Sequence, residues 1–128
     1  MASRKIEDCT PELQEKYAAF KAAMDAAGVP FMLTCTYRSQ EEQNELYAQG
    51  RTKPGRRVTW TTLSKHTGRV AFDIAITRAG TPVWDVKVDV NNDEIPDYQQ
   101  AGQIGESVGL TWGGRWKTPD LPHYEVRL

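Results

Sequence analysis

The chain has 128 residues, and its 16 lysines and arginines nearly balance 17 aspartates and glutamates, giving a formal net charge of −1. This balance argues against a protein whose main task is to bind nucleic acid or an anionic membrane surface. No apolar run reaches the roughly 18 residues that a membrane span requires. With 39% hydrophobic residues, the chain is long enough to form one core, and we expect a single domain over residues 1–128.

The N-terminal segment and the two cysteines indicate a reducing compartment. Residues 1–8 contain no apolar core, so they are not typical of a secretory signal, and we expect the chain to stay in the cytoplasm where it is made. Cys9 and Cys35 permit at most one disulfide, and in that compartment we expect free thiols. Cys35 alternates in phase with Phe31 and Leu33, which predicts a small core residue rather than a metal ligand.

Helices and strands are both predicted, in an order without a repeating βαβ pattern. Capping residues and apolar residues at helical spacing predict helices at residues 10–28, 39–50 and 97–109. Alternating or apolar runs predict strands at residues 31–37, 70–76, 82–88, 110–112 and 123–128. We therefore expect an α+β fold with about three helices and a small, mostly antiparallel sheet.

A basic loop follows the second predicted helix. Its charged residues are Arg51, Lys53, Arg56 and Arg57. A charge run of this size is usually a solvated surface. A loop that faces a substrate is the alternative, because residues 51–62 directly precede the first histidine-containing segment.

Both histidines of the chain stand near carboxylates. Strand alternation over residues 70–76 places Asp73 on the face opposite the apolar residues, between Ala71 and Ala75, whose small side chains leave space beside it. A half-buried carboxylate in this position needs a cation or a hydrogen-bond donor. His66 lies seven residues upstream, and a glycine-containing turn can bring it back over Asp73.

The second histidine lies near the C-terminus. Pro119 and Pro122 keep the chain between them out of helix and central strand, so that Asp120 and His123 can converge from a bend. Two imidazoles and one carboxylate form a catalytic zinc set that keeps a fourth position for water.

The same pattern suggests further roles and one structural alternative. Asp120 is the candidate general base, and Arg38, on the polar side of the first strand, is the candidate for binding an oxyanion or a substrate carboxylate. In the alternative, His66 caps a surface turn, Asp73 pairs with Arg69 or Arg78, and His123 is an ordinary partly buried ring.

At these residues the sequence resembles the zinc D-alanyl-D-alanine carboxypeptidases and L-alanyl-D-glutamate endopeptidases of the lysostaphin, D-Ala-D-Ala peptidase and hedgehog group, especially single-domain bacteriophage endolysins. That family has Ser-x-His, an aspartate seven residues after the histidine, and Asp-x-x-His or Glu-x-x-His near the end. The matching residues are Ser64, His66, Ala71, Asp73, Asp120 and His123. Tyr37-Arg38-Ser39 and Trp112-Gly113-Gly114 match two further segments. The family's glycine three residues after the first histidine is Arg69 here, with Gly68 one residue earlier, which affects the expected loop path.

The resemblance implies a role for each matched residue. His66, Asp73 and His123 would hold Zn²⁺, Asp120 would be the base, and Arg38 would orient the substrate or stabilise the oxyanion. Ser64 would bind substrate or cap its own turn. Glu125 is a rival base or a partner of His123. Trp112, with Trp116, would line a groove for the sugar-peptide polymer or pack in the core.

An acidic loop precedes the third predicted helix. Asp89, Asn91 and Asp93 match the first half of a calcium loop, but Glu94 stands where glycine is expected and Gln100 replaces the bidentate glutamate. A Ca²⁺ site and a solvated turn both remain open.

The implied activity is hydrolysis of the stem peptide of bacterial peptidoglycan by zinc-activated water, and we expect cleavage between L-alanine and D-glutamate. The alternatives are a D-alanyl-D-alanine carboxypeptidase, a hedgehog-like zinc module without catalysis, and a structural protein without metal. We expect a monomeric phage lysis enzyme without a separate cell-wall-binding domain. It would act on periplasmic peptidoglycan after a separate membrane-permeabilising protein releases it from the host cytoplasm.

Overall fold

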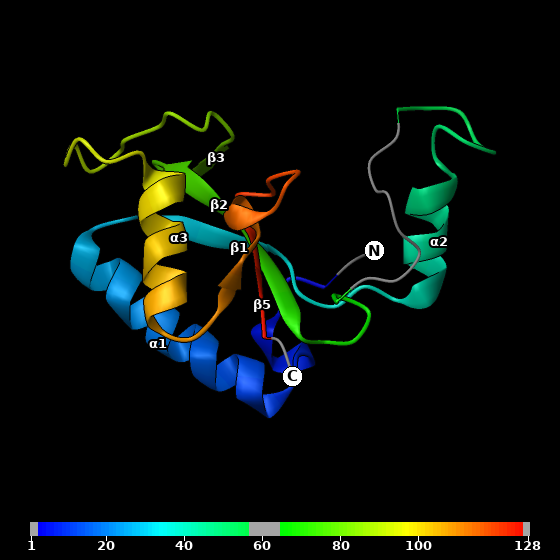
Figure 1. Cartoon of the computed structure of the whole chain (residues 1–128), viewed down its shortest axis with the longest axis horizontal. Helices are drawn as coiled ribbons and strands as arrows, with labels where there is room; N and C mark the ends of the chain where they lie inside the picture. The colour runs from blue at the N-terminus through cyan, green and yellow to red at the C-terminus, as the bar shows by residue number, and fades with distance from the viewer. Residues whose placement is uncertain (1–2, 57–64, 127–128) are drawn as a thin grey trace.

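The computed structural model describes residues 3–56 and 65–126 (Figure 1). Its helical elements are η1 (Ile6–Asp8), α1 (Pro11–Ala27), α2 (Gln40–Ala48), α3 (Asp97–Ser107) and η2 (Gly113–Arg115). Its strands are β1 (Phe31–Cys35), β2 (Ala71–Arg78), β3 (Thr81–Val83), β4 (Thr111–Trp112) and β5 (His123–Glu125). The predicted α+β class, with three α-helices and an antiparallel sheet in the described part of the chain, is confirmed.

The sheet is built around β2. Its strand order is β1-β2-β5-β4, and β3 pairs with β2 outside this path. All pairings are antiparallel, and their register places Asp73 opposite Cys35 on one side and opposite His123 on the other. The register shifts between Leu33 and Cys35, so β1 ends two residues earlier than the sequence predicts.

Local signals explain where two of the helices begin. The Thr10 hydroxyl accepts the Leu13 N–H at the start of α1. A complete capping box joins Ser39 and Glu42 at the start of α2. Asp97, predicted to cap the third helix, is instead its first residue, because its carboxylate accepts the N–H of Val90 in the preceding loop.

Helices α1 and α3 pack on the sheet, whereas α2 stands apart from them (Figure 1). The core contains buried residues from both helices and from β2 and β5: Leu13, Phe20, Met24, Phe72, Ile74, Ile76, Tyr98, Ala101 and Tyr124. Close approach of α3 requires small residues, because a Cβ on Gly105 would lie 2.7 Å from the Tyr124 ring. This packing leaves the opposite face of β2, which carries Asp73, free for other side chains.

Both cysteines are free, as predicted, and both are buried. Within residues 3–56 and 65–126, no helix has the length and apolar character needed to cross a membrane.

Tyr98 links α3 to the sheet edge, and its removal should lower stability. Its buried hydroxyl donates to Val83 O at 2.6 Å and accepts from the Ile76 N–H at 3.1 Å. Tyr98→Phe leaves both backbone groups without this partner, so the free energy of unfolding in urea should fall by about 1–3 kcal/mol. Tyr17→Phe is the control, because Tyr17 packs through its ring against Phe20, Phe31 and Phe72 and its hydroxyl makes no hydrogen bond to the described residues. An equal loss in both variants would contradict the assignment.

Candidate metal centre

Two histidines and one aspartate converge on one point of the sheet. Asp73 Oδ1 lies 3.2 Å from His66 Nε2 and 3.0 Å from His123 Nδ1. The two imidazole ring centroids are 5.1 Å apart. Asp73 and His123 meet because β2 and β5 pair at these residues, and His66 reaches them from the turn before β2.

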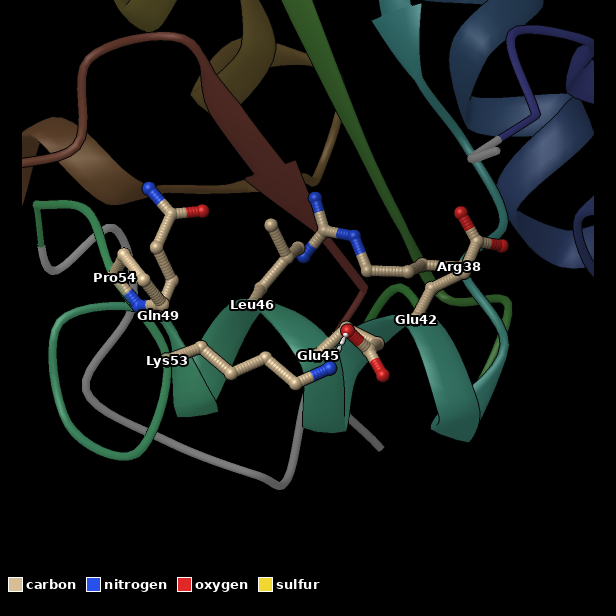
Figure 2. A pocket seen from close by; sticks show the side chains of 7 residues that line it. All are labelled: Arg38, Glu42, Glu45, Leu46, Gln49, Lys53 and Pro54. Carbon is tan, nitrogen blue, oxygen red and sulfur yellow. Dashed lines mark hydrogen bonds and ion pairs between the residues drawn. The ribbon is translucent and has the colours of Figure 1, made fainter.

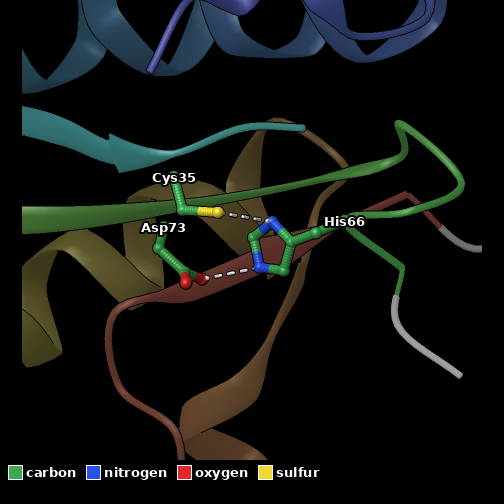
Figure 3. A group of neighbouring side chains, drawn as sticks. All are labelled: Cys35, His66 and Asp73. Atoms are coloured by element: carbon green, nitrogen blue, oxygen red, sulfur yellow. Dashed lines mark hydrogen bonds and ion pairs between the residues drawn. The ribbon is translucent and has the colours of Figure 1, made fainter. Parts of the chain in front are cut away.

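The ring nitrogen of His66 that faces away from Asp73 is Nδ1, and it contacts residues at the end of β1. His66 Nδ1 lies 3.1 Å from Thr36 O, and because a carbonyl only accepts, this nitrogen carries the proton. Cys35 Sγ lies 3.6 Å from the same nitrogen (Figure 3). The Nε2 lone pair of neutral His66 therefore faces Asp73.

His123 is arranged in the same way with its nitrogens exchanged. Its Nε2 lies 2.9 Å from Oε1 of Glu125, a residue that is only 2% exposed. An ionised carboxylate only accepts hydrogen bonds, so Nε2 carries the proton and the Nδ1 lone pair of neutral His123 faces Asp73. The Trp116 ring packs against the imidazole with centroids 5.0 Å apart and limits its rotation.

These lone pairs repel the Asp73 carboxylate unless a positive charge lies between them. In the absence of metal, protons supply it: burial lowers the pKa of His66, but Asp73 and Cys35 outweigh this and raise it to about 10. Burial also opposes protonation of His123, yet Asp73 and Glu125 raise its pKa to about 9. Burial alone would raise the pKa of Asp73, but His123 and His66 hold it well below its usual value.

The donor set fits a divalent metal. Tetrahedral zinc with ligand bonds of about 2.0–2.2 Å places neighbouring donors roughly 3.3 Å apart, close to the two Asp73 distances of 3.2 and 3.0 Å. The donor atoms of Cys35, His66 and Asp73 all lie within 4.8 Å of one another. His123 is joined to this group through its 3.0 Å contact with Asp73. In this arrangement Cys35 faces the protonated nitrogen of His66, so we interpret it as a neighbour of the ligands. The predicted core position in phase with Leu33 is wrong, because the register shift after Leu33 turns Cys35 toward the metal centre.

Asp120 lies one turn before His123. Its backbone N–H donates to Gly113 O, and its own carbonyl accepts the His123 N–H. The turn fits closely against Gly113, where an added Cβ would lie 2.5 Å from Asp120 O. The Asp120 side chain is exposed. Desolvation by the surrounding chain raises its pKa, and repulsion from Asp73 raises it further, while His123 and His66 act in the opposite direction.

Arg38 approaches from the other side of β2. Its guanidinium donates to Gln43 Oε1 at 2.8 Å and lies 3.5 Å from Cys35 Sγ. It lines a hollow of about 420 Å³ together with residues of α2 and the following loop: Glu42, Glu45, Leu46, Gln49, Lys53 and Pro54 (Figure 2). Lys53 and Pro54 of the basic loop thus line the hollow, while Arg57 and residues 58–62 lie outside the described residues.

A second hollow adjoins Asp120. It has a volume of about 210 Å³ and is lined by Trp84, Val86, Tyr98, Pro119, Asp120, Leu121 and Pro122. The predicted strand over residues 82–88 ends at Val83, so Trp84 and Val86 are exposed, at 57% and 53%. The sequence prediction missed this apolar surface because it assigned both residues to the sheet.

The structure places the remaining predicted residues elsewhere. Trp112 is 6% exposed, and its indole N–H donates to Leu121 O, which favours core packing over a substrate groove. Ser64 lies outside the described residues. Asp89, Asn91 and Asp93 lie in the loop before α3, apart from the metal centre. Glu125, considered as a rival base, contacts the side of His123 that faces away from Asp73.

Comparison with known proteins identifies the family. Residues 57–126, more than half of the chain, match a family model described as D-alanyl-D-alanine carboxypeptidase, of the M15 peptidases. Over 123 residues the chain is 37% identical to the peptidoglycan L-alanyl-D-glutamate endopeptidase CwlK of Bacillus subtilis, covering 93% of this chain and 74% of CwlK. The chain belongs to the M15 family of metallopeptidases. The resemblance seen in the sequence is therefore confirmed.

Solved structures share the M15 fold. Serratia marcescens L-Ala D-Glu endopeptidase ChiX matches with a TM-score of 0.73 and 22% identity, covering 99% of this chain and 89% of ChiX. The vancomycin-resistance D,D-pentapeptidase VanY, solved in complex with Zn(II), matches with a TM-score of 0.60 and 18% identity, covering 92% of this chain and 72% of VanY.

Loss of the Glu125 charge should weaken metal binding, because its carboxylate sets the proton position and orientation of His123. Partners of this kind typically contribute 10–100-fold to metal affinity. Glu125→Gln should therefore weaken zinc binding by about 10–100-fold in competition with a chromophoric chelator. The control is Glu41→Gln, an exposed change on α2. Equal affinity in the Glu125 variant and the wild type would argue against this role.

Proposed function

We propose that the chain is a zinc-dependent peptidase that hydrolyses the stem peptide of bacterial peptidoglycan between L-alanine and D-glutamate. The observation that carries the proposal is the convergence of His66 and His123 on Asp73 Oδ1. The other ring nitrogen of each histidine contacts a hydrogen-bond acceptor, the Thr36 carbonyl for His66 and the Glu125 carboxylate for His123. Membership of the M15 family and 37% identity to CwlK support the peptidoglycan substrate. The same family membership favours an enzyme over a non-catalytic zinc module or a structural protein.

In this proposal His66, Asp73 and His123 hold the metal. The neutral tautomers described above leave one nitrogen of each histidine available, and Asp73 supplies the negative charge. A zinc ion held by these two imidazoles and one carboxylate would supply Lewis-acid activation of a water molecule. Zn(II) in the VanY structure, which has the same fold, agrees with this choice of metal.

Asp120 is proposed as the general base. The turn that joins it to His123 keeps its carboxylate near the metal centre, and its raised pKa brings it closer to the range in which it can both accept and return a proton. It would take the proton of the attacking water and transfer it to the leaving amine. Arg38, held by Gln43 beside Cys35, would stabilise the developing oxyanion or bind a substrate carboxylate.

The two hollows support an endopeptidase. Arg38 follows β1 and Asp120 precedes β5, so these residues approach Asp73 from the two strands that flank β2. The hollows that they line share no residue. A peptide that passes over the metal centre can thus extend in two directions, as cleavage within a stem peptide requires.

A D-alanyl-D-alanine carboxypeptidase is the second candidate. The matching family model carries this description, and the Arg38 guanidinium is suited to bind the carboxylate at the end of a stem peptide. The two activities share the metal centre and differ in the bond that is cut.

The biological setting is also a proposal. A compact M15 domain of this size fits a monomeric phage endolysin that reaches periplasmic peptidoglycan from the host cytoplasm, aided by a separate permeabilising protein. The net charge of −1 is compatible with a neutral or basic partner surface and gives no electrostatic drive toward nucleic acid.

Substitutions should separate the metal ligands from the base. His66→Ala, Asp73→Ala and His123→Ala should each lower zinc content and abolish wall lysis, because each removes a donor. Asp120→Asn should keep zinc content near that of the wild type while reducing the lysis rate by at least about 100-fold. Elemental analysis and turbidity of purified cell walls measure the two properties. Chelation should abolish lysis and added Zn²⁺ restore it.

Equal zinc content in the wild type and all three alanine variants would contradict the ligand set. Lysis by Asp120→Asn at the wild-type rate would contradict the proposed base.

Product analysis should identify the scissile bond. Purified peptidoglycan digested by the wild type should release stem peptides with a new D-glutamate N-terminus and leave L-alanine on the sugar, as seen by mass spectrometry. Release of free D-alanine alone would support the carboxypeptidase instead. Asp120→Asn serves as the control for contaminating hydrolases, because its folded metal centre should be intact.

A further inference from the structure

The loop between β3 and α3 gathers three carboxylates away from the metal centre. One oxygen each of Asp89, Asp93 and Asp97 lies within 4.8 Å of the others. We propose that these residues, together with Asn91, form a calcium site that stabilises the start of α3. The inference does not rest on the proposed function, because no residue of this loop belongs to the metal centre.

Asp97 is the observation that distinguishes this cluster from an ordinary acidic surface. The residue is 0% exposed, and its Oδ2 accepts the Val90 N–H at 2.6 Å. Its Oδ1 is buried without a hydrogen-bond partner among the described residues. A buried carboxylate oxygen without a partner is costly, whereas a cation in the cluster would compensate it.

The charges around Asp97 lead to the same conclusion. Burial raises the pKa of Asp97, and the like charges of Asp89 and Asp93 raise it further, although the Val90 N–H and Arg78 act in the opposite direction. Burial and the charges of Asp89 and Asp93 thus oppose the ionised form of Asp97, and a bound cation would favour it.

The backbone of the loop follows the calcium-loop pattern despite its atypical residues. Counting Asp89 as position 1, Asn91, Asp93 and Asp97 stand at the ligand positions 3, 5 and 9. Glu94 stands at position 6, where glycine is usual, and it adopts the required left-handed conformation with φ of 69°. Asp89 accepts the N–H groups of Asp93 and Glu94 at 3.2 and 2.9 Å, which holds the loop closed around the carboxylates.

The donor types select calcium. The side chains at these positions offer oxygen atoms and no sulfur or imidazole, which favours a hard cation over zinc. The oxygens belong to an irregular loop and differ in burial, from buried Asp97 to exposed Asp93. Such an arrangement suits the flexible coordination of Ca²⁺ better than the octahedron required by Mg²⁺. Gln100 at position 12 supplies neither a charge nor a bidentate carboxylate, so we expect a dissociation constant on the order of 10⁻⁴–10⁻³ M.

A bound ion would join three parts of the fold. Asp97 is the first residue of α3, and the Asn91 side-chain amide donates to Ala27 O at the end of α1. Trp84 and Val86, which line the hollow beside Asp120, lie in the segment that leads into this loop. Calcium would therefore fix the α1–α3 junction and limit the motion of that segment.

Calorimetry and thermal unfolding test the proposal on the zinc-loaded full chain. Titration with CaCl₂ should give one binding event, and calcium at ten times the dissociation constant should raise Tm by about 3–6 °C. Asp93→Asn, a change at an exposed residue, and Asp97→Asn should each weaken calcium binding at least tenfold. Asp85→Asn is the matched control, because Asp85 is an exposed acid of the same segment outside the cluster.

Several results would overturn the proposal. They are the absence of both binding heat and a Tm shift at 10-fold excess over the expected dissociation constant, unchanged affinity in Asp93→Asn, and magnesium binding as tight as calcium binding. Asp93→Asn decides the matter if Asp97→Asn fails to fold. Zinc content should remain equal in all variants, which separates this site from the metal centre.

Discussion

The contact of Asp73 with two imidazoles is the interaction on which the functional part of the molecule depends. It exists because β2 pairs with β5 in a register that sets Asp73 opposite His123, while the turn before β2 returns His66 to the same carboxylate. The opposite face of β2 is buried against α1 through Phe72, which contacts Phe20 and stacks on Tyr124. A slip of β5 by one residue would move His123 into the core and Tyr124 to the polar face, so core packing and the ligand geometry enforce the same register.

The surroundings of the two histidines are complementary. His66 is held through Nδ1 by a backbone carbonyl, and His123 is held through Nε2 by the Glu125 carboxylate. Each ring therefore directs its other nitrogen toward Asp73, and neither can rotate without losing a buried contact. This preorganisation keeps the two nitrogen lone pairs close to the Asp73 carboxylate, and a bound metal ion would relieve the repulsion between them.

Short-range patterns predicted much of the architecture. The cap at Thr10, the capping box at Ser39 and the alternation along β2 each depend on neighbouring residues, and all three are present in the structure. The placement of Asp73 on the face away from Phe72 and Ile74 followed from the same alternation. The histidines are 57 positions apart, between residues 66 and 123, so their neighbouring carboxylates indicated a shared site only as one of two alternatives, and the family resemblance decided between them.

Long-range packing decided the features that could not be predicted. The register shift after Leu33 turns Cys35 toward His66, and no local pattern marks it. Trp112 is buried because Gly102 and Gly114 leave room for its ring. Asp97 begins α3 instead of capping it because a partner seven residues earlier captures its carboxylate.

The single turn that connects Asp120 to His123 has a consequence for how such a domain can diversify. Their spacing is set by local backbone hydrogen bonds and by the fit against Gly113, independently of α2 with its following loop and of the segment around Trp84, which line other parts of the hollows. Exchange of the α2 loop or of the segment around Trp84 would therefore alter which peptide is held, while the reactive groups keep their mutual positions. Substrate preference and chemistry can thus evolve as separable properties of one small fold.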